Sequence, residues 1–488
     1  MRYLKMSVAA VCMVSCSFAD PSVKDLGAGR ELMWDMCRID GLGGGANLKL
    51  HQPQLKEVSI VHDAPWEGNC CGYHTVIHDG AKYRMYYRGS ASNMKGCAHA
   101  ELTCYAESDD GISWRKPNLG ICEFKGSKEN NIIFLHNAKT RVTHNFTPFL
   151  DANPNCPADE KYKGLAGIGD TKLYGYASAD GIHWRQIGDS PVITKGAFDS
   201  QNLAFWDVQR GMYVSYYRTY RFGKRAIQIA TSPDFRTWSD PKWLEYDKDS
   251  PNVELYTNSI FPYDRAPGMY VGFPKRFTAG RCSIYDELGR RPGALPGTSD
   301  AVFMSSRDGQ NFKLWGEAFL RPGLQHERWI NRNNMTAWGY VVTKSDIPGC
   351  PDEISLYSTE NYYAPSTPDR LRRMTIRLDG FVSVNAPYGG GTVTTKPLKF
   401  SAAAGKGTRL LLNASTSGAG FVRCEIRDAN GNPYPGYSLA DSEEVFGDEI
   451  ELPMSWKSGS DVSALAGKTV VLHFSLKDAD VYSYRFGE

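Results

Sequence analysis

The same short phrase occurs four times along the chain, and it constrains the fold more than any other feature. Its copies begin at Ser108, Ser178, Ser232 and Ser306, and each places an aspartate two residues after the serine. In such a turn the aspartate accepts backbone N–H bonds, and the glycine that follows it in three copies supplies a left-handed residue. A phrase that returns at intervals of roughly 50 to 75 residues indicates a repeated supersecondary unit, here a propeller blade with loops of variable length.

Alternating, tyrosine-rich runs precede these turns and favour β-strands over helices. They cover residues 83–88, 212–218 and 269–274, and their period of two is typical of half-buried strands. Counting the strands predicts five blades, which begin near Trp66, His144, Asp199, Glu254 and Glu327. Residues near 32–55 are expected to supply the strand that closes the ring, because an open propeller would leave an unpaired edge.

The pattern changes after residue 384, where three consecutive glycines at 389–391 are followed by regular strands and short turns. This texture is typical of a β-sandwich. The sequence therefore predicts an all-β protein with a signal peptide at residues 1–19, a five-bladed propeller at 20–384 and a C-terminal β-sandwich at 385–488.

The first residues predict export. A basic start is followed by a short apolar run and small residues before a cut at Asp20, which is the pattern of a secretory signal. A lipid anchor at Cys16 is the alternative, because residues 13–16 loosely resemble a lipobox. No later stretch is apolar enough to cross a bilayer. We expect a secreted or periplasmic protein without a membrane span.

Charge and cysteine content limit the partners and cofactors. The net charge of +2 gives no electrostatic reason to expect nucleic acid or an anionic membrane as a partner. Cysteines crowd the first blade, and in an oxidising compartment they predict disulfides there. They show no zinc-ligand spacing, so we expect no metal and no cofactor. The oligomeric state stays open.

The repeated Ser-x-Asp-Gly-x-x-Trp turn and the strand–turn–tyrosine-rich strand rhythm resemble the exported glycosidases of the invertase/inulinase type, and the propeller alone resembles the arabinanase/xylosidase type. The chain is similar to a divergent relative of these, a family 32 N-terminal-domain-like protein, since the Asn-Asp-Pro-Asn, Arg-Asp-Pro and Glu-Cys-Pro signatures of invertases are missing. The resemblance implies a carbohydrate substrate and acidic catalytic residues from the first strands of successive blades.

Glycoside hydrolysis needs one carboxyl that protonates the leaving oxygen and one carboxylate that attacks the anomeric carbon or activates water. In the first blade Glu67 or Asp63 is a candidate nucleophile or base, with Trp66 as a sugar-stacking platform. In the third blade Asp199 is the strongest candidate. In the fourth, Glu254 is the candidate general acid. The alternative for each acid is a turn or ion-pair role without a ligand.

Further polar residues are predicted to bind the substrate. In the second blade, His144 and Asn145 stand where the invertase type holds an aspartate. They are expected to bind sugar hydroxyl groups, but they cannot replace a carboxylate nucleophile. Lys275 could contact an anionic substrate group, and the arginines that close two tyrosine-rich strands are expected either to reach the axis or to be structural. The predicted binding residues are His144, Asn145, Gln201, Asn202, Tyr256, Asn258, Glu327, Arg88 and Arg218.

Three functions compete at this point. The first is a secreted glycoside hydrolase acting on poly- or oligosaccharide. The second is a non-catalytic carbohydrate-binding propeller, which the missing invertase signatures favour. The third is a sialidase-like enzyme, which would need three arginines on a carboxylate and a tyrosine–glutamate pair. The sequence leaves the sugar, the linkage and exo or endo action open, and retention or inversion depends on the separation of the two carboxyl groups in space.

Overall fold

The computed structural model describes residues 23–92, 99–168, 172–281, 296–364, 367–402 and 407–488. The predicted signal peptide, Cys16 and Cys97 lie outside these residues. The chain divides into two compact units: a larger one of Leu32–Asp35 and Leu48–Val384, and a smaller one of Met1–Glu31, Met36–Asn47 and Asn385–Glu488. The described residues are nearly all β, as the sequence predicts, and the sheets of the larger unit are arranged like the blades of a propeller.

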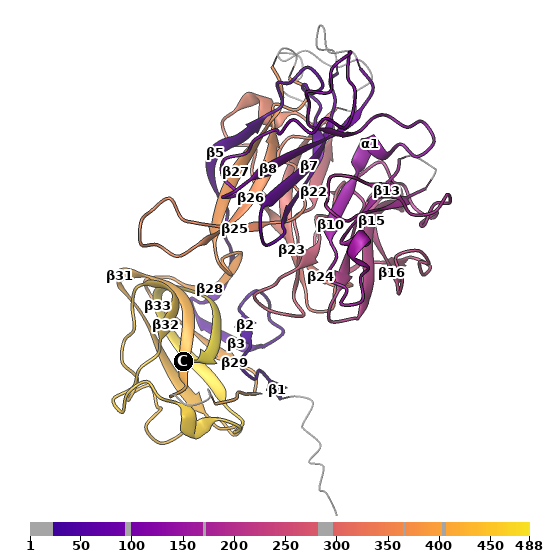
Figure 1. Ribbon diagram of the computed structural model, residues 1–488. Coiled ribbons are helices and arrows are strands. Elements are labelled where there is room, and N and C mark those ends of the chain that lie inside the picture. Colours follow the sequence, from indigo (N-terminus) through magenta and orange to yellow (C-terminus); the bar gives the residue numbers. More distant parts are fainter. Residues whose placement is uncertain (1–22, 93–98, 169–171, 282–295, 365–366, 403–406) are drawn as a thin grey trace, which may run out of the picture. The chain divides into compact units, whose positions relative to one another are not determined.

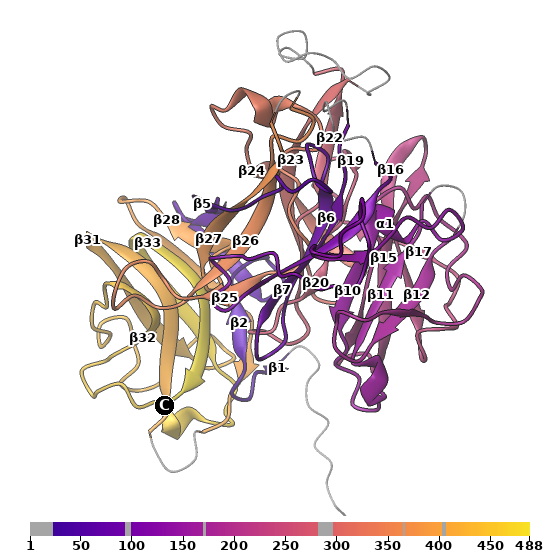
Figure 2. The same cartoon turned by 45° about the horizontal axis from the view of Figure 1, so that its top comes forward.

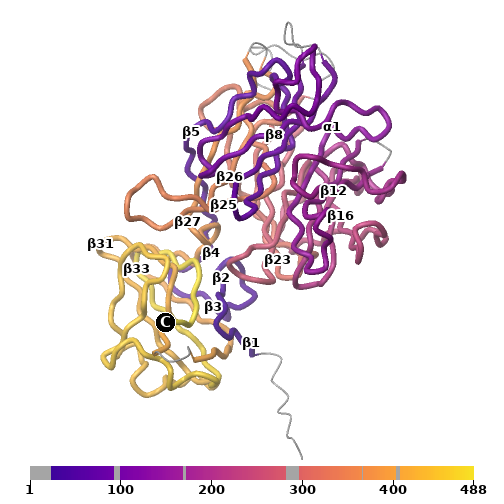
Figure 3. The backbone as a smooth tube through the Cα atoms, in the orientation of Figure 1, coloured from indigo at the N-terminus to yellow at the C-terminus, as the bar shows by residue number. Residues whose placement is uncertain are grey.

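Three sheets of the larger unit are formed by four consecutive, antiparallel strands each. The first contains β6 (Gly72–His78), β7 (Tyr83–Gly89), β8 (Leu102–Ser108) and β9 (Ile132–Phe134). The second contains β10 (Thr147–Leu150), β11 (Tyr162–Ala166), β12 (Tyr174–Ser178) and β13 (Arg185–Gln186). The third contains β14 (Leu203–Asp207), β15 (Met212–Arg221), β16 (Lys224–Ser232) and β17 (Lys242–Trp243). The tube in Figure 3 passes through them in sequence order.

The next sheet along the chain has seven strands. They are β18 (Glu245–Tyr246), β19 (Glu254–Leu255), β20 (Phe261–Pro262), β21 (Tyr270–Gly272), β22 (Lys275–Ala279), β23 (Gly297–Ser306) and β24 (Asn311–Leu320). Short β19 and β22 pair with each other, and β22 continues onto β23. This pairing places residues 254–256 beside Lys275.

The last sheet of the larger unit joins the two ends of its chain. It contains β25 (Val341–Thr343), β26 (Glu353–Glu360), β27 (Arg370–Arg377) and β5 (Gln54–Val61) in that order. Figure 1 shows indigo β5 beside orange β27. The closing strand therefore comes from residues 54–61, slightly later than the predicted 32–55. Pairing the outer edge of β27 with an early strand removes an exposed sheet edge.

All four predicted aspartate turns form, and local hydrogen bonds explain them. In the first, Asp110 Oδ1 accepts the backbone N–H groups of Ile112 and Ser113 at 2.7 and 2.8 Å, and Ser108 Oγ accepts that of Gly111 at 2.9 Å. The third copy has Phe235 at the glycine position, with φ of 63°. These turns are structural, because in each copy the serine Oγ and the aspartate Oδ1 accept N–H groups of the local backbone.

The same turns join neighbouring sheets. A tyrosine hydroxyl from the middle of one sheet donates to the turn glycine's carbonyl in the next: Tyr86 to Gly181 at 2.9 Å and Tyr216 to Gly309 at 2.5 Å. Tyr357 of the last sheet donates in the same way to Gly111 of the first. Trp184 packs its ring edge-on against Tyr86, with centroids 6.1 Å apart. Figure 2 shows the sheets that these contacts connect.

We expect Tyr86→Phe to lower the free energy of unfolding of the larger unit by about 1 kcal/mol, because it removes a buried hydrogen bond between two sheets, while the Gly181 carbonyl keeps a second donor in Trp184 Nε1 at 3.0 Å. Urea unfolding followed by tryptophan fluorescence measures the change. Tyr220→Phe is the control, since the Tyr220 side chain is 48% exposed and should tolerate the change. Equal stabilities of the two variants would contradict the joining role.

The predicted disulfides of the first blade are not supported by the described residues. Cys70, Cys71, Cys104 and Cys122 are free thiols. Cys71 and Cys104 lie in the apolar core with Val76, Met85 and Ile132, and burial raises the pKa of both thiols well above its usual range. Cys71 and Cys104 are close in the sequence because consecutive strands of one sheet contribute to the same core. A free cysteine behaves there as a small apolar residue.

The smaller unit is formed mainly by long antiparallel strands. It contains β1 (Lys24–Asp25), β2 (Arg30–Leu32), β3 (Ile39–Gly44), β29 (Gly391–Thr395), β30 (Leu398–Lys399), β31 (Arg409–Arg427), β32 (Asp448–Pro453) and β33 (Val471–Gly487). Two further strands, β4 (Asn47–Leu50) and β28 (Val382–Ala386), cross the boundaries between the two units, as β2 does at Leu32. Most of these strands, including β31 and β33, belong to one hydrogen-bonded sheet, so the C-terminal sandwich stays a prediction.

Helices are few and short. They are α1 (Val142–Asn145) and the 3-10 helices η1 (Ala158–Glu160), η2 (His326–Trp329) and η3 (Ser463–Leu465). None of the helices in the described residues has the length and apolarity needed to cross a bilayer.

Candidate active site

Ionisable and tyrosine side chains from three sheets of the larger unit, and from segments next to its strands, meet in one cluster, which we call the central cluster. Five of its members are predicted site residues: Asp199 before β14, His144 in α1, Arg88 in β7, Arg218 in β15 and Tyr256 directly after β19. The other members are Tyr73 of β6, Glu101 before β8, Lys275 of β22, Arg332 between η2 and β25, and Tyr362 after β26. Residues far apart in the sequence thus share one place.

His144 bridges two carboxylates. Its Nδ1 lies 3.0 Å from Glu101 Oε1, and its Nε2 lies 3.1 Å from Asp199 Oδ1. An ionised carboxylate oxygen only accepts hydrogen bonds, so the imidazole is the donor in each of these contacts that is a hydrogen bond. Arg88 Nη1 lies 3.4 Å from the same Nδ1. The bridge fixes the orientation of the Asp199 carboxylate.

Asp199 is the accessible carboxylate of the cluster. Its side chain is 41% exposed, whereas that of His144 is 8% exposed. Burial favours the neutral acid, but the hydrogen bond from His144 and the charges of His144, Arg218 and Arg332 outweigh burial and hold the pKa of Asp199 below its usual range. Asp199 is therefore an ionised group that can act as a nucleophile or base.

Glu101 is the partner of His144 on the other side. Burial raises the pKa of Glu101, but the hydrogen bond from His144 and the charge of Arg88 lower it by more than burial raises it. The resulting pKa is about 2. Arg88 Nη1 lies 3.5 Å from Glu101 Oε1, and Arg88 Nη2 donates to the Tyr362 hydroxyl at 2.5 Å. Glu101 thus holds His144 and Arg88 in place.

We expect Glu101→Gln to destabilise the larger unit by about 1–3 kcal/mol at pH 6 and by much less at pH 2.5. The folded pKa of about 2 lies below the unfolded value of about 4.3. The carboxylate's contribution is therefore complete above the unfolded pKa and is lost as pH falls towards 2. Urea unfolding at pH 2.5, 4 and 6 measures it. Glu245→Gln, at a half-exposed site, is the control, and a pH-independent difference for Glu101→Gln would contradict the assignment.

Tyr256 is the aromatic centre of the cluster. Its hydroxyl lies 3.5 Å from Asp199 Oδ2 and accepts from Arg332 Nη2 at 3.5 Å. Lys275 Nζ lies 3.8 Å from the centre of its ring, and the Arg218 guanidinium lies 5.0 Å from it. Cations at these distances are attracted to the face of an aromatic ring. The Tyr256 ring therefore holds the charges of Lys275 and Arg218 close to Asp199.

Two predicted catalytic acids of the first blade lie outside the central cluster. Glu67 is fully buried and accepts hydrogen bonds from Tyr87 Oη at 2.5 Å, Lys116 Nζ at 2.5 Å and the Ala64 N–H at 3.0 Å. Asp63 is exposed and also pairs with Lys116, at 3.1 Å. This environment is that of a structural ion pair, because the Glu67 oxygens are occupied by protein donors.

Trp66 also has a partner within the fold. Its Nε1 donates to Asn131 Oδ1 at 2.6 Å, and its ring packs against the first-blade core. The structure does not bring Trp66 into the central cluster.

The predicted amide side chains support the backbone near the cluster. Asn145 Nδ2 donates to the carbonyls of Phe198 and Ser200 at 2.8 and 2.6 Å. Asn202 Nδ2 donates to the same two carbonyls. Because the amides are buried and bonded to main chain, they fix the segment that carries Asp199 rather than face a ligand.

The other two amides act between strands. Gln201 Nε2 donates to the His74 carbonyl at 3.0 Å and so links the third sheet to the first. Asn258 Nδ2 donates to the Tyr216 carbonyl at 3.3 Å. Both side chains are buried.

Glu254 lies at the edge of the cluster. Its carboxylate is 24% exposed and pairs with Arg225 Nη1 at 2.6 Å, and the Arg225 guanidinium lies 5.1 Å from the Tyr256 ring centre. Glu327, in η2, is half-buried, and the structure shows no bond from its carboxylate to the cluster.

Sequence reasoning missed Glu101, Tyr73, Arg332 and Tyr362. None of them belongs to a repeated phrase, and Arg332 and Tyr362 lie in irregular segments between strands. The usable signal was Arg88, whose strand β7 pairs with β8 so that Gly89 faces Leu102, the residue after Glu101. Strand pairing, and not composition, could have found Glu101.

One group of described residues has the ligand types and spacing for a metal ion: His62, Cys71 and Asp369. All three are buried, and His62 Nδ1 lies 2.6 Å from Asp369 Oδ1. Burial lowers the pKa of His62 to about 4 and raises that of Asp369 well above its usual range. A neutral imidazole beside a protonated carboxyl satisfies the same contacts, so the geometry does not require a metal.

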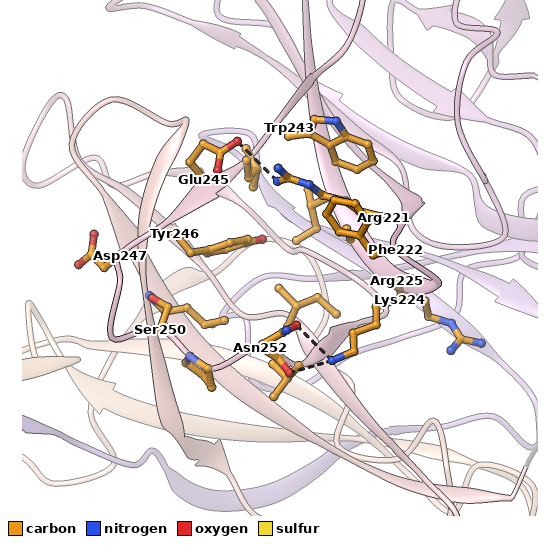
Figure 4. A pocket seen from close by; sticks show the side chains of 17 residues that line it. Arg221, Phe222, Lys224, Arg225, Trp243, Glu245, Tyr246, Asp247, Ser250 and Asn252 are labelled. Carbon is orange, nitrogen blue, oxygen red and sulfur yellow. Dashed lines mark hydrogen bonds and ion pairs between the residues drawn. The ribbon is translucent and has the colours of Figure 1, made fainter.

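A separate pocket of about 390 Å³ lies between the third sheet and the seven-stranded sheet (Figure 4). Phe222, Trp243 and Tyr246 line it, and Arg221 pairs with Glu245 at 3.5 Å across it. Arg225 belongs to its wall and also to the ring of cations around Tyr256. The pocket is therefore next to the central cluster but has its own lining.

No family model matches the chain, and no curated protein is similar to it in sequence. Several solved structures are similar at low identity. An N-acetylgalactosamine deacetylase from F. plautii, in complex with blood group B trisaccharide, is 14% identical with a TM-score of 0.44, over 67% of this chain and 94% of that one. A Bombyx mori GH32 β-fructofuranosidase is 11% identical with a TM-score of 0.38, over 90% of this chain and 93% of its own.

Proposed function

We propose that this protein is a secreted glycoside hydrolase that cleaves poly- or oligosaccharide at the central cluster. The observation that carries the proposal is Asp199, an ionised and accessible carboxylate held by His144 in the central cluster. Propeller folds place ligand sites where their blades meet. In the same proposal the seven-stranded sheet counts as one blade of five, and the C-terminal unit is a β-sandwich.

The chemistry assigns two roles to carboxyl groups. Asp199 attacks the anomeric carbon or removes a proton from the attacking water. Glu254 is the proposed proton donor to the leaving oxygen, and a bound sugar would have to replace Arg225 as its partner. The hydroxyl of Tyr256 and the guanidinium of Arg88 are the proposed sugar-binding groups.

A carbohydrate-binding protein without hydrolysis is the second candidate, and one observation favours it. Among the described residues, Glu101 lies on the far side of His144 and Glu254 is bonded to Arg225. Neither therefore faces Asp199 across an open space, as the two carboxyls of a glycosidase do.

One assay separates the two candidates. The protein is incubated with a panel of plant, fungal and animal glycans, and new reducing ends are measured together with binding by calorimetry. Product that disappears in Asp199→Asn and Glu254→Gln supports hydrolysis at this site. Binding without product over long incubation supports the second candidate, and unchanged turnover in both variants removes the site assignment.

A further inference from the structure

Three cations of the central cluster have no carboxylate within ion-pair distance among the described residues: Arg218, Lys275 and Arg332. Arg218 donates through Nε to the Ala197 carbonyl at 3.0 Å, and Lys275 donates to Asn331 Oδ1 at 3.3 Å. Arg332 donates only to the hydroxyls of Tyr362 and Tyr256, at 3.2 and 3.5 Å. Each therefore binds neutral groups alone.

This situation differs from that of other buried cations in the same unit. Lys163 is as buried as Lys275, but it pairs with Asp151 at 2.6 Å and with Glu160 at 3.4 Å. Buried charges are normally paired because the cost of removing them from water is large. The lack of a carboxylate partner for Lys275 among the described residues thus distinguishes the central cluster.

The three cations converge on one tyrosine. Lys275 Nζ and the guanidinium carbons of Arg218 and Arg332 lie 3.8, 5.0 and 5.9 Å from the centre of the Tyr256 ring. The two terminal nitrogens of Arg218 have no acceptor among the described residues, so its planar edge is open to a two-point contact. Carboxylates and sulfates are the groups that accept such a contact best.

The electrostatics of the unliganded cluster agree. Burial and then repulsion from Arg332 and Arg225 lower the pKa of Lys275 well below its usual range. The ionised Asp199 compensates only part of the positive charge of the three cations, since it also accepts a hydrogen bond from His144. A second anion would relieve this repulsion.

We propose that Arg218, Lys275 and Arg332 bind an anionic group on the sugar, so that the substrate is an acidic saccharide bearing a carboxylate or a sulfate. This inference rests on the proposed function, because it names the substrate class of the same site. The anion contacts these three cations around the Tyr256 ring and so holds the neighbouring glycosidic bond close to Asp199, whose Oδ2 lies 3.5 Å from the Tyr256 hydroxyl.

Calorimetry with matched sugar pairs tests the proposal. The pairs are glucuronic acid and glucose, 3′-sialyllactose and lactose, and galactose 6-sulfate and galactose. We expect at least one acidic member to bind 10-fold or more tightly than its neutral partner, with an affinity that falls as salt is raised. The pair that shows the difference tells carboxylate from sulfate. Equal affinities within all three pairs would overturn the proposal.

Variants of the cations provide a second readout. Arg218→Gln and Lys275→Met should each lower the affinity for the acidic sugar about 10-fold or more and leave that for the neutral partner unchanged. Lys275→Met should also raise the melting temperature, because it replaces an unpaired buried charge with an apolar chain of similar length. A loss of stability in Lys275→Met, with unchanged acidic-sugar affinity in both variants, would contradict the proposal. Arg221→Met, outside the cluster, is the control.

The outcomes separate this inference from the proposed function. Hydrolysis of neutral and acidic sugars at equal rates, with dependence on Asp199, would overturn the anion site and keep the hydrolase. Binding of acidic sugar that depends on Arg218, without any Asp199-dependent product, would keep the anion site and overturn the hydrolase.

Discussion

Asp199→Asn is expected to lower kcat on a hydrolysed glycan by about 10²–10⁴-fold, the contribution typical of a positioned acid–base group. The amide keeps the volume of the carboxylate and can still accept a hydrogen bond from His144 through its oxygen. It cannot attack carbon or take a proton from water at neutral pH. Initial rates of reducing-end release, compared with the wild type at equal folded concentration, measure the loss.

The control for this variant is Asp240→Asn, because Asp240 is an exposed aspartate that pairs with Lys195 far from the cluster. It should keep full turnover. Asp199→Asn should also lower stability at neutral pH, because His144, Arg218 and Arg332 favour the ionised carboxylate in the folded state, so circular dichroism must first show that the variant is folded under the assay conditions. Full turnover in Asp199→Asn, with strongly reduced turnover in Glu254→Gln, would move the catalytic base elsewhere and contradict the assignment.

Lys116→Met should lower the free energy of unfolding by about 3–5 kcal/mol, because it leaves the buried Glu67 carboxylate without its cation. Lys116 Nζ lies 2.5 Å from Glu67 Oε2, and Glu67 is 0% exposed. The remaining donors, Tyr87 Oη and the Ala64 N–H, are neutral. Urea unfolding at pH 7, with tryptophan fluorescence and circular dichroism as separate probes, measures the change.

An ion pair of equal length but opposite burial provides the control. Lys195 Nζ also lies 2.5 Å from its partner, Asp240 Oδ1, and both side chains are exposed. Lys195→Met should leave stability nearly unchanged, because solvent screens exposed pairs. Glu67→Gln distinguishes the roles of Glu67 itself: lower stability with normal kcat in the folded protein indicates structure, whereas normal stability with lost kcat indicates catalysis.

The sequence was most informative where the interactions are local. Ser108, Asp110 and Gly111 bond to one another and to the next two N–H groups, so a seven-residue phrase was sufficient to predict the turn. The joining role of that turn depends on Tyr357, 246 residues away. The repeat could be recognised from the chain alone, but the partner sheet of each turn could not.

The candidate site divides in the same way. Asp199 and His144 were recognisable as polar residues beside predicted strands, although 55 residues separate them and only the fold shows their hydrogen bond. Glu67 looked equally suitable in sequence. Only the tertiary structure shows that Glu67 is buried against Lys116. Whether a carboxylate can act in catalysis depends on which hydrogen-bond donors contact it and on whether solvent reaches it.

The sequence by itself determined the β class, the aspartate turns and several residues of the central cluster, because alternation and turn chemistry act over a few neighbouring residues. Tertiary structure alone decided which strand closes the ring, that the described first-blade cysteines are free, and that Arg218, Lys275 and Arg332 gather round Tyr256. Whether two charges pair depends on their distance in the folded protein. When they lie far apart along the chain, no local sequence pattern predicts that distance.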